Sequence, residues 1–217
     1  MRVTRICSLL LVTFLALIVA SPAFANSVNM TYEGHGGIGN QGNSPYIGYP
    51  YYVSINGSSN YTAVMCDSYD NVVTLGQSWT ATATPFLQGI SSSMFGLSAI
   101  LDYKAAGLIF KSMLAGTLTP TQAQWAVWGL FSVNAQNNPF FSNISAGSID
   151  STYLTLAETA PNSSYSGLVL YTPAGAKPGV GPQEFIGYSP VPEPGTLTLI
   201  GTGLIGLAGA IRRRLSA

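Results

Sequence analysis

Cys66 is the residue in this 217-residue chain with the clearest capacity for chemistry. The only other cysteine, Cys7, lies in an N-terminal apolar segment that we expect to be removed, so the mature protein has no intramolecular disulfide. An unpaired cysteine in an exported protein indicates intermolecular pairing or a reactive thiol. An inert cysteine that packs as a small hydrophobic side chain is the alternative, and the cysteine count alone favours it.

The other polar residues show no hydrolytic or metal-binding pattern. The single histidine, His35, has no spacing that supports a Ser-His-Asp arrangement, and one His, one mature Cys and scattered carboxylates do not recur at ligand intervals. We therefore expect no metal and no cofactor. Asp67 and Asp70 leave a carboxylate pair for glycoside hydrolysis as an alternative, although strand-end and turn roles explain them more simply. We expect a protein without catalytic turnover.

The N-terminus has the three parts of a secretory signal peptide. Arg2 and Arg5 precede an apolar run over residues 6–20, and small residues follow at Ala23 and Ala25. The apolar run is shorter than the roughly 20 residues of a bilayer span. We expect signal peptidase to remove residues 1–25, so that the mature chain begins at Asn26; an uncleaved N-terminal anchor is the alternative.

The C-terminal segment, residues 191–217, also has three parts. An extended, proline-rich motif comes first and consists of Val191, Pro192, Glu193 and Pro194. An uncharged stretch over residues 196–211 follows, which as a helix is roughly 24 Å long and marginally spans a bilayer core of about 30 Å. The stretch ends at a basic cluster that holds this end in the cytoplasm, formed by Arg212, Arg213 and Arg214.

This ending resembles a PEP-CTERM sorting signal. The resemblance implies transient anchoring in the inner membrane, processing by an exosortase near Pro194, and release or re-attachment at the cell surface. It further implies a Gram-negative-type envelope and a biofilm or exopolysaccharide setting, but no activity for the rest of the chain. A plain C-terminal membrane anchor is the alternative.

Between the two signals the chain is mildly acidic. Three lysines stand against seven acidic residues, which gives a net charge of −4 for residues 26–190 although the whole chain is neutral. This domain has no electrostatic footprint for nucleic acid. Residues 26–50 are rich in Gly, Asn and Tyr, so we interpret them as a flexible lead-in to one extracytoplasmic domain over residues 51–190.

The hydrophobic pattern predicts strands, then helices, then strands. Alternating β-branched and aromatic runs predict strands at residues 51–55, 61–66, 72–75 and 79–83, and later at 168–172 and 184–188. Steps of three and four residues predict helices at 97–116, at 120–132 after a Thr119 capping box, and at 148–159. The fold class is therefore α+β: a β-sandwich or barrel with an inserted two- to three-helix block, plus the N-terminal signal helix and the C-terminal transmembrane helix.

Two motifs of this domain resemble the thioester domains of bacterial surface adhesins. Val64-Met65-Cys66-Asp67 ends a strand, and Gln124-Trp125-Ala126-Val127-Trp128 lies in the second helix. The resemblance implies that Cys66 supplies a thiol and Gln124 an acyl group, which condense into a thioester shielded by Trp125 and Trp128. Ala123 and Met65 depart from the family's pattern.

Two functions follow from these observations. The first is a non-catalytic structural or adhesive protein that associates with exopolysaccharide or neighbouring surfaces, in which Trp125 and Trp128 are core residues and Gln124 is a surface or capping amide. The second is a thioester adhesin that bonds once, covalently, to a surface amine through Cys66 and Gln124.

Overall fold

The computed structural model describes residues 26–36 and 49–189, together with the helical residues Gly203 and Gly206. The chain divides into two compact units, and the unit Ala25–Ser189 contains every strand of the described residues. The predicted signal helix and transmembrane helix fall on residues that are otherwise outside the description. Within the described part of the chain, no helix is both long enough and apolar enough to cross a bilayer.

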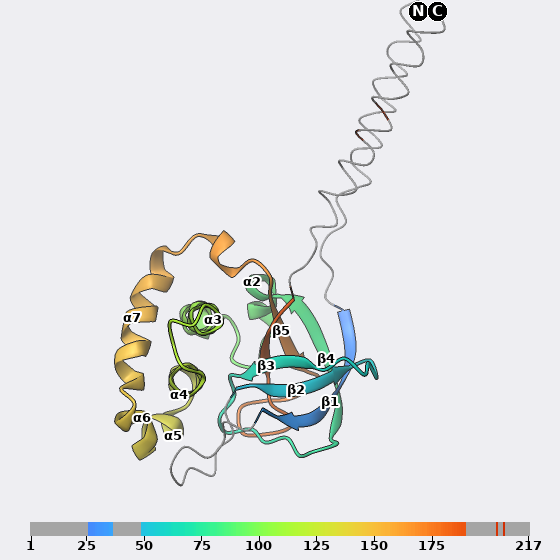
Figure 1. Cartoon of the computed structure of the whole chain (residues 1–217), viewed down its shortest axis with the longest axis horizontal. Helices are drawn as coiled ribbons and strands as arrows, with labels where there is room; N and C mark the ends of the chain where they lie inside the picture. The colour runs from blue at the N-terminus through green and yellow to red at the C-terminus, as the bar shows by residue number, and fades with distance from the viewer. Residues whose placement is uncertain (1–25, 37–48, 190–202, 204–205, 207–217) are drawn as a thin grey trace, which may run out of the picture. The chain divides into compact units, whose positions relative to one another are not determined.

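Six antiparallel strands close into a barrel in the order β1-β2-β3-β6-β5-β4 (Figure 1). The strands are β1 (Asn26–His35), β2 (Tyr51–Ile55), β3 (Thr62–Cys66), β4 (Ser78–Pro85), β5 (Leu168–Pro173) and β6 (Phe185–Tyr188). The closure depends on β1, whose first half pairs with β4 and whose second half pairs with β2. The barrel alternative of the predicted fold class is therefore the one that the structure contains.

The predicted flexible lead-in is wrong for residues 26–35, because β1 occupies them. Val28, Met30 and Tyr32 are buried in alternation with more exposed neighbours, which is the period of a half-buried strand. The chain register shifts between Tyr32 and Gly34, where Gly34 adopts a φ of 129° that other residues avoid.

A helical block is inserted between β4 and β5 and packs against one side of the barrel (Figure 1). Its α-helices are α2 (Phe86–Gly89), α3 (Ile100–Leu114), α4 (Pro120–Phe131), α5 (Val133–Gln136), α6 (Pro139–Asn143) and α7 (Ala146–Thr159). Its 3₁₀ turns are η1 (Ile90–Ser92), η2 (Leu97–Ala99) and η3 (Asn162–Tyr165). Helices α3 and α4 lie between the barrel and α7, which forms the outer layer (Figure 1).

The three long predicted helices are present as α3, α4 and α7. Two details of the prediction are wrong. Residues 72–75 form a loop instead of a strand, and residues 134–139, expected only to stop the second helix, include part of α5 and the start of α6. In both places the sequence has short apolar or polar runs whose local pattern does not distinguish loop from helix or strand.

Aromatic rings fill the barrel interior. Phe185 lies 5.5 Å from Tyr51 and 6.1 Å from Trp79, measured between ring centroids, although neither β2 nor β4 is hydrogen-bonded to β6. These contacts therefore cross the barrel. Cys66 is the direct partner of Phe185 in the antiparallel ladder, so the two side chains share the inner face. The last residue of β3, Cys66, therefore places its side chain at the end of the barrel interior.

Candidate functional site

The start of α4 fixes the position of Gln124. The Thr119 hydroxyl accepts a hydrogen bond from the Gln122 backbone N–H at 3.2 Å, and the Gln122 side chain accepts one from the Thr119 N–H at 3.1 Å. Pro120 occupies the first turn, where its missing N–H costs nothing. This predicted capping box is confirmed, and it sets the helical register that places Gln124 and Trp128 on one face.

Gln124 and Cys66 meet between α4 and the end of β3. Both residues are completely buried. The Gln124 Nε2 donates a hydrogen bond to the Cys66 backbone oxygen at 2.6 Å, while the Gln124 Oε1 has no hydrogen-bond partner among the described residues. The interpretation of Gln124 as a surface or capping amide is therefore wrong, and the two residues of the proposed thioester lie together.

The groups around the Cys66 sulfur shift the pKa of the thiol in opposite directions. Burial, followed by the proximity of Asp67, raises the pKa of the Cys66 thiol to about 12. The Ser68 side chain, which lies within hydrogen-bonding reach of the sulfur, acts in the lowering direction. The Ser68 Oγ lies 3.9 Å from the Cys66 Sγ. The buried sulfur thus has a polar neighbour in Ser68, whereas a cysteine that only fills space needs none.

An aromatic cluster includes two residues of the helix that carries Gln124 and one residue of the loop after Cys66. The rings of Trp125 and Trp128 are perpendicular, with centroids 5.2 Å apart, and Tyr69 contacts both of them at 5.9 and 5.2 Å. Phe140 stacks on Trp125 at 5.8 Å. Trp125 and Trp128 are buried, as the sequence predicted for either function. The four rings form one aromatic cluster that joins α4 and α6 to the loop after Cys66.

Three residues of the loop after Cys66 form hydrogen bonds to other parts of the domain. The Ser68 Oγ accepts a hydrogen bond from the Glu184 backbone N–H at 2.8 Å. The exposed Asp70 carboxylate accepts hydrogen bonds from the Ser132 hydroxyl at 2.7 Å and the Asn134 side chain at 2.8 Å. The buried Asn71 side chain bonds to four backbone groups of the loop between β5 and β6, namely the oxygens of Lys177, Gly181 and Pro182 and the N–H of Gly179.

A buried pair of carboxyl groups lies where β3 ends and β6 begins, and the Asp67 N–H bonds to the Glu184 backbone oxygen. Asp67 and Glu184 are both 0% exposed. Burial and the neighbouring Glu184 charge raise the pKa of Asp67 well above its usual value, and burial raises the pKa of Glu184 as well. Glu184 accepts hydrogen bonds from the Tyr103 hydroxyl, from the Thr172 hydroxyl at 2.6 Å and from the Met94 N–H at 2.9 Å.

These donors favour the ionised form of Glu184, so of the two carboxyl groups Asp67 is the one that stays protonated. The structure therefore pairs Asp67 with Glu184 and not with Asp70, which the sequence had offered as its carboxylate partner. Neither Ser68 nor Glu184 was singled out from the sequence. A serine two residues after a candidate nucleophile is a weak signal, and nothing in a single sequence connects Asp67 with Glu184.

The other predicted site residues take no part in this arrangement. His35 ends β1. The signal-cleavage residues Ala23 and Ala25, the motif over residues 191–194 and the basic cluster Arg212, Arg213 and Arg214 all lie outside the described residues. A search of the described residues for three or more His, Cys, Asp or Glu side chains placed to hold a metal ion finds none.

Comparison with known proteins finds one match. Residues 190–214 match the PEP-CTERM protein-sorting motif. The chain therefore carries the sorting signal of an exported protein that is anchored transiently in the membrane and processed by an exosortase. Neither the curated proteins nor the solved structures contain a significant match to this chain.

Proposed function

We propose that this protein acts at the cell surface or in the extracellular matrix, where its barrel-and-helix domain forms an internal thioester between Cys66 and Gln124. The bond is used once, without turnover, to attach the protein covalently to a primary amine on a neighbouring surface. Its formation requires that the Cys66 sulfur bond to the Gln124 Cδ while the Cδ–Nε2 bond breaks. The thiol proton leaves with the nitrogen as ammonia.

The observation that carries this proposal is the side-chain amide of Gln124, which is buried and has a hydrogen-bond partner for only one of its two polar atoms. Its Nε2 reaches the backbone of Cys66 at 2.6 Å, and its Oε1 is unpartnered. A buried acceptor without a partner costs about 1–3 kcal/mol. An apolar side chain at this position would avoid that cost but would also remove the donor to the Cys66 oxygen, so the glutamine is held against Cys66 by one amide atom while the other has no partner.

The enclosure of the pair also fits the proposal. A thioester must be protected from water until its nucleophile arrives, because hydrolysis would destroy it. Both Cys66 and Gln124 are completely buried, and the aromatic cluster of Trp125, Trp128 and Tyr69 includes the two residues that follow Gln124 on α4 at one and four positions.

The test is the intact mass of the mature protein, recovered from cells and unfolded in acid. Thioester formation lowers the mass by about 17 Da, the mass of the ammonia lost. Cys66→Ala and Gln124→Ala each abolish the loss. A wild-type protein of full mass, whose Cys66 is fully alkylated after unfolding, would overturn the proposal.

The second candidate is a non-covalent structural or adhesive protein that associates with exopolysaccharide in a biofilm. It is favoured by an open groove of about 580 Å³ at the start of α4, which is lined by uncharged residues at 119–122 and 143–145. Full mass in the experiment above, together with retention of the protein on purified exopolysaccharide, would favour this candidate over the first. Loss of retention on filling the groove with Ser145→Trp would place the contact there.

A further inference from the structure

The described domain ends close to the part of the chain that anchors it in the membrane. The Ser189 N–H donates a hydrogen bond to the Gly167 backbone oxygen at 2.9 Å, so the chain leaves the barrel at the end of β6, beside the start of β5. Only the six residues 190–195 separate Ser189 from the uncharged stretch over residues 196–211. Six fully extended residues reach about 20 Å. While the sorting signal anchors the protein, the surface around Ser189 therefore stays within about 20 Å of the bilayer.

Two large exposed side chains and a lysine lie at this end of the domain. Tyr188, the last residue of β6, is 42% exposed, and Leu114, the last residue of α3, is 43% exposed. Lys111 lies one turn before Leu114, and its Nζ is 5.8 Å from the centre of the Tyr188 ring. The same Nζ donates a hydrogen bond to the Ser166 backbone oxygen at 3.0 Å. We call the surface formed by Lys111, Leu114 and Tyr188 the anchored face.

Gly167 allows the Tyr188 ring to lie at this surface. Its φ of 80° is one that other residues rarely adopt, and a Cβ at this position would lie 2.7 Å from the Tyr188 Cε2. The ring therefore packs directly on the backbone at the start of β5. Packing and the contact with Lys111 hold the tyrosine in place although it is partly exposed.

The residue types of the anchored face suit the headgroup region of a membrane. Tyrosine is enriched at membrane–water interfaces because its ring is apolar and its hydroxyl is polar. Lysine lays its apolar stem along such a surface while its ammonium group stays among the headgroups, where anionic lipids attract it. Residues 26–190 carry a net charge of −4, from three lysines and seven acidic residues. An anionic bilayer therefore repels the domain as a whole and favours a face that presents a lysine.

We propose that the anchored face rests on the headgroups of an anionic phospholipid bilayer for as long as the sorting signal anchors the protein. Three side chains hold a free protein on a membrane only weakly, but a short tether raises the effective concentration of the face at the bilayer to about the millimolar range. The contact is therefore lost when processing removes the tether. Because β6 runs from Phe185, opposite Cys66, to Tyr188, the contact directs the Cys66 end of the barrel away from the bilayer.

The experiment uses the anchored chain, residues 26–217, reconstituted in vesicles of phosphatidylcholine and phosphatidylglycerol whose lipids carry bromine near the headgroup. Bromine quenches tryptophan fluorescence at short range, and the three native tryptophans are buried. Leu114→Trp adds an exposed probe on the anchored face. Its emission should lose most of its intensity in brominated vesicles relative to vesicles without bromine.

Val180→Trp is the matched probe. Val180 is 66% exposed in the loop between β5 and β6, and the six residues of β5 place about 20 Å between this loop and the anchored face. The emission added by Val180→Trp should be the same with and without bromine.

The contributions of charge and ring are tested in the Leu114→Trp protein. Lys111→Gln keeps most of the stem but removes the charge, so quenching should weaken and should no longer fall when 1 M salt shortens the screening length to about 3 Å. Lys177→Gln removes a lysine from the loop at the other end of β5 and should leave the quenching and its salt dependence unchanged. Tyr188→Ser should weaken the quenching at every salt concentration.

Three results would overturn the inference. Equal quenching of the two probes would show that the domain turns no particular face to the lipid. The absence of quenching at both would show that the domain is held away from the bilayer. Quenching of Leu114→Trp that neither Lys111→Gln nor Tyr188→Ser changes would refute the anchored face. None of these results depends on the thioester, which the intact mass tests separately.

Discussion

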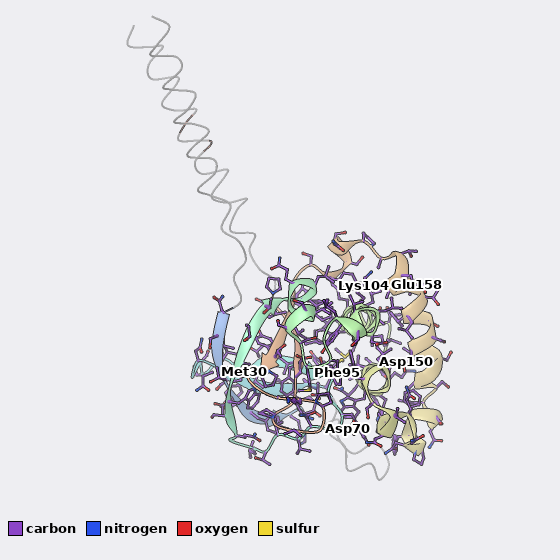
Figure 2. The ribbon with its side chains drawn as sticks, turned by 180° about the vertical axis from the view of Figure 1, so that it is seen from behind. Met30, Asp70, Phe95, Lys104, Asp150 and Glu158 are labelled. Carbon is purple, nitrogen blue, oxygen red and sulfur yellow. The ribbon has the colours of Figure 1, made fainter. Side chains whose placement is uncertain are left out.

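Asp150 makes the stability of the domain depend on pH in a direction that is easily tested. Its side chain lies on α7 (Figure 2), where it is 7% exposed, and its Oδ1 has no hydrogen-bond partner in the described part of the chain. Burial, followed by the charge of Asp102 on α3, raises the pKa of the Asp150 carboxyl from 3.8 to about 8. The folded protein therefore keeps Asp150 protonated at a pH where the unfolded chain has released that proton.

The sign and size of the effect follow from linkage. Because the pKa is higher in the folded state, the free energy of unfolding falls as the pH rises from about 4 to about 8, and this contribution is fully present only below pH 4. One pKa unit corresponds to about 1.4 kcal/mol. Integration gives a loss of about 3 kcal/mol between pH 5 and 7 and about 1 kcal/mol more between pH 7 and 9. Asp150→Asn removes this dependence, since the amide does not titrate.

The assay is urea unfolding of the mature wild type and of Asp150→Asn at pH 5, 7 and 9. Between pH 5 and pH 7, the free energy of unfolding of the variant should rise by about 3 kcal/mol relative to that of the wild type. Other buried groups, including Asp67, titrate in both proteins, so the difference between the two isolates Asp150. Glu158→Gln changes an exposed carboxyl on the same helix (Figure 2) and should run parallel to the wild type. Parallel curves for Asp150→Asn would refute the assignment of a buried neutral carboxyl.

Three further changes test the elements that hold the site. Tyr103→Phe removes a donor to the Glu184 carboxylate and should cost about 1.5–3 kcal/mol in urea unfolding at pH 7. Gly129→Ala would place a Cβ 2.1 Å from Phe141, so we expect thermal unfolding to show a loss of about 1–3 kcal/mol from overpacking; an unchanged melting temperature would contradict that packing. Thr119→Ala removes the N-cap of α4 and should lower the free energy of unfolding by about 1 kcal/mol in the same measurement. Thr119→Ser keeps a capping hydroxyl and should retain most of that stability.

The helices of the fold were accessible to sequence analysis because their signals are local. Thr119 and Pro120 mark the first turn of α4 within a few residues, and the structure contains that turn as expected. The same locality explains the error at β1. The Gly- and Asn-rich composition of residues 26–50 concealed the alternation of Val28, Met30 and Tyr32, which is a strand signal.

The contacts of the site depend on residues that are distant in the sequence. The motif at Gln124 indicated which helix carries it, but the hydrogen bond to the Cys66 oxygen joins residues 58 positions apart. Asp67 and Glu184 lie side by side although they are even farther apart in the sequence. This pairing arises because β3 and β6 are neighbours in the barrel and place the two residues side by side at their ends. A pairing of this kind follows from strand order, which hydrophobic periodicity does not specify.

That pairing changes the role of the residue beside the candidate nucleophile. An ionised Asp67 would oppose formation of a thiolate at Cys66, and from the sequence alone it is an unhelpful neighbour. In the structure, Glu184 accepts hydrogen bonds from Tyr103, Thr172 and Met94 and carries the negative charge, so Asp67 stays protonated. While Asp67 holds its proton it adds no charge beside the sulfur, and it raises the pKa of the thiol only once it ionises. The end of β3 thus lies beside two environments: an acidic pair whose charge is held against α3, and a sulfur whose polar neighbour is the Ser68 hydroxyl.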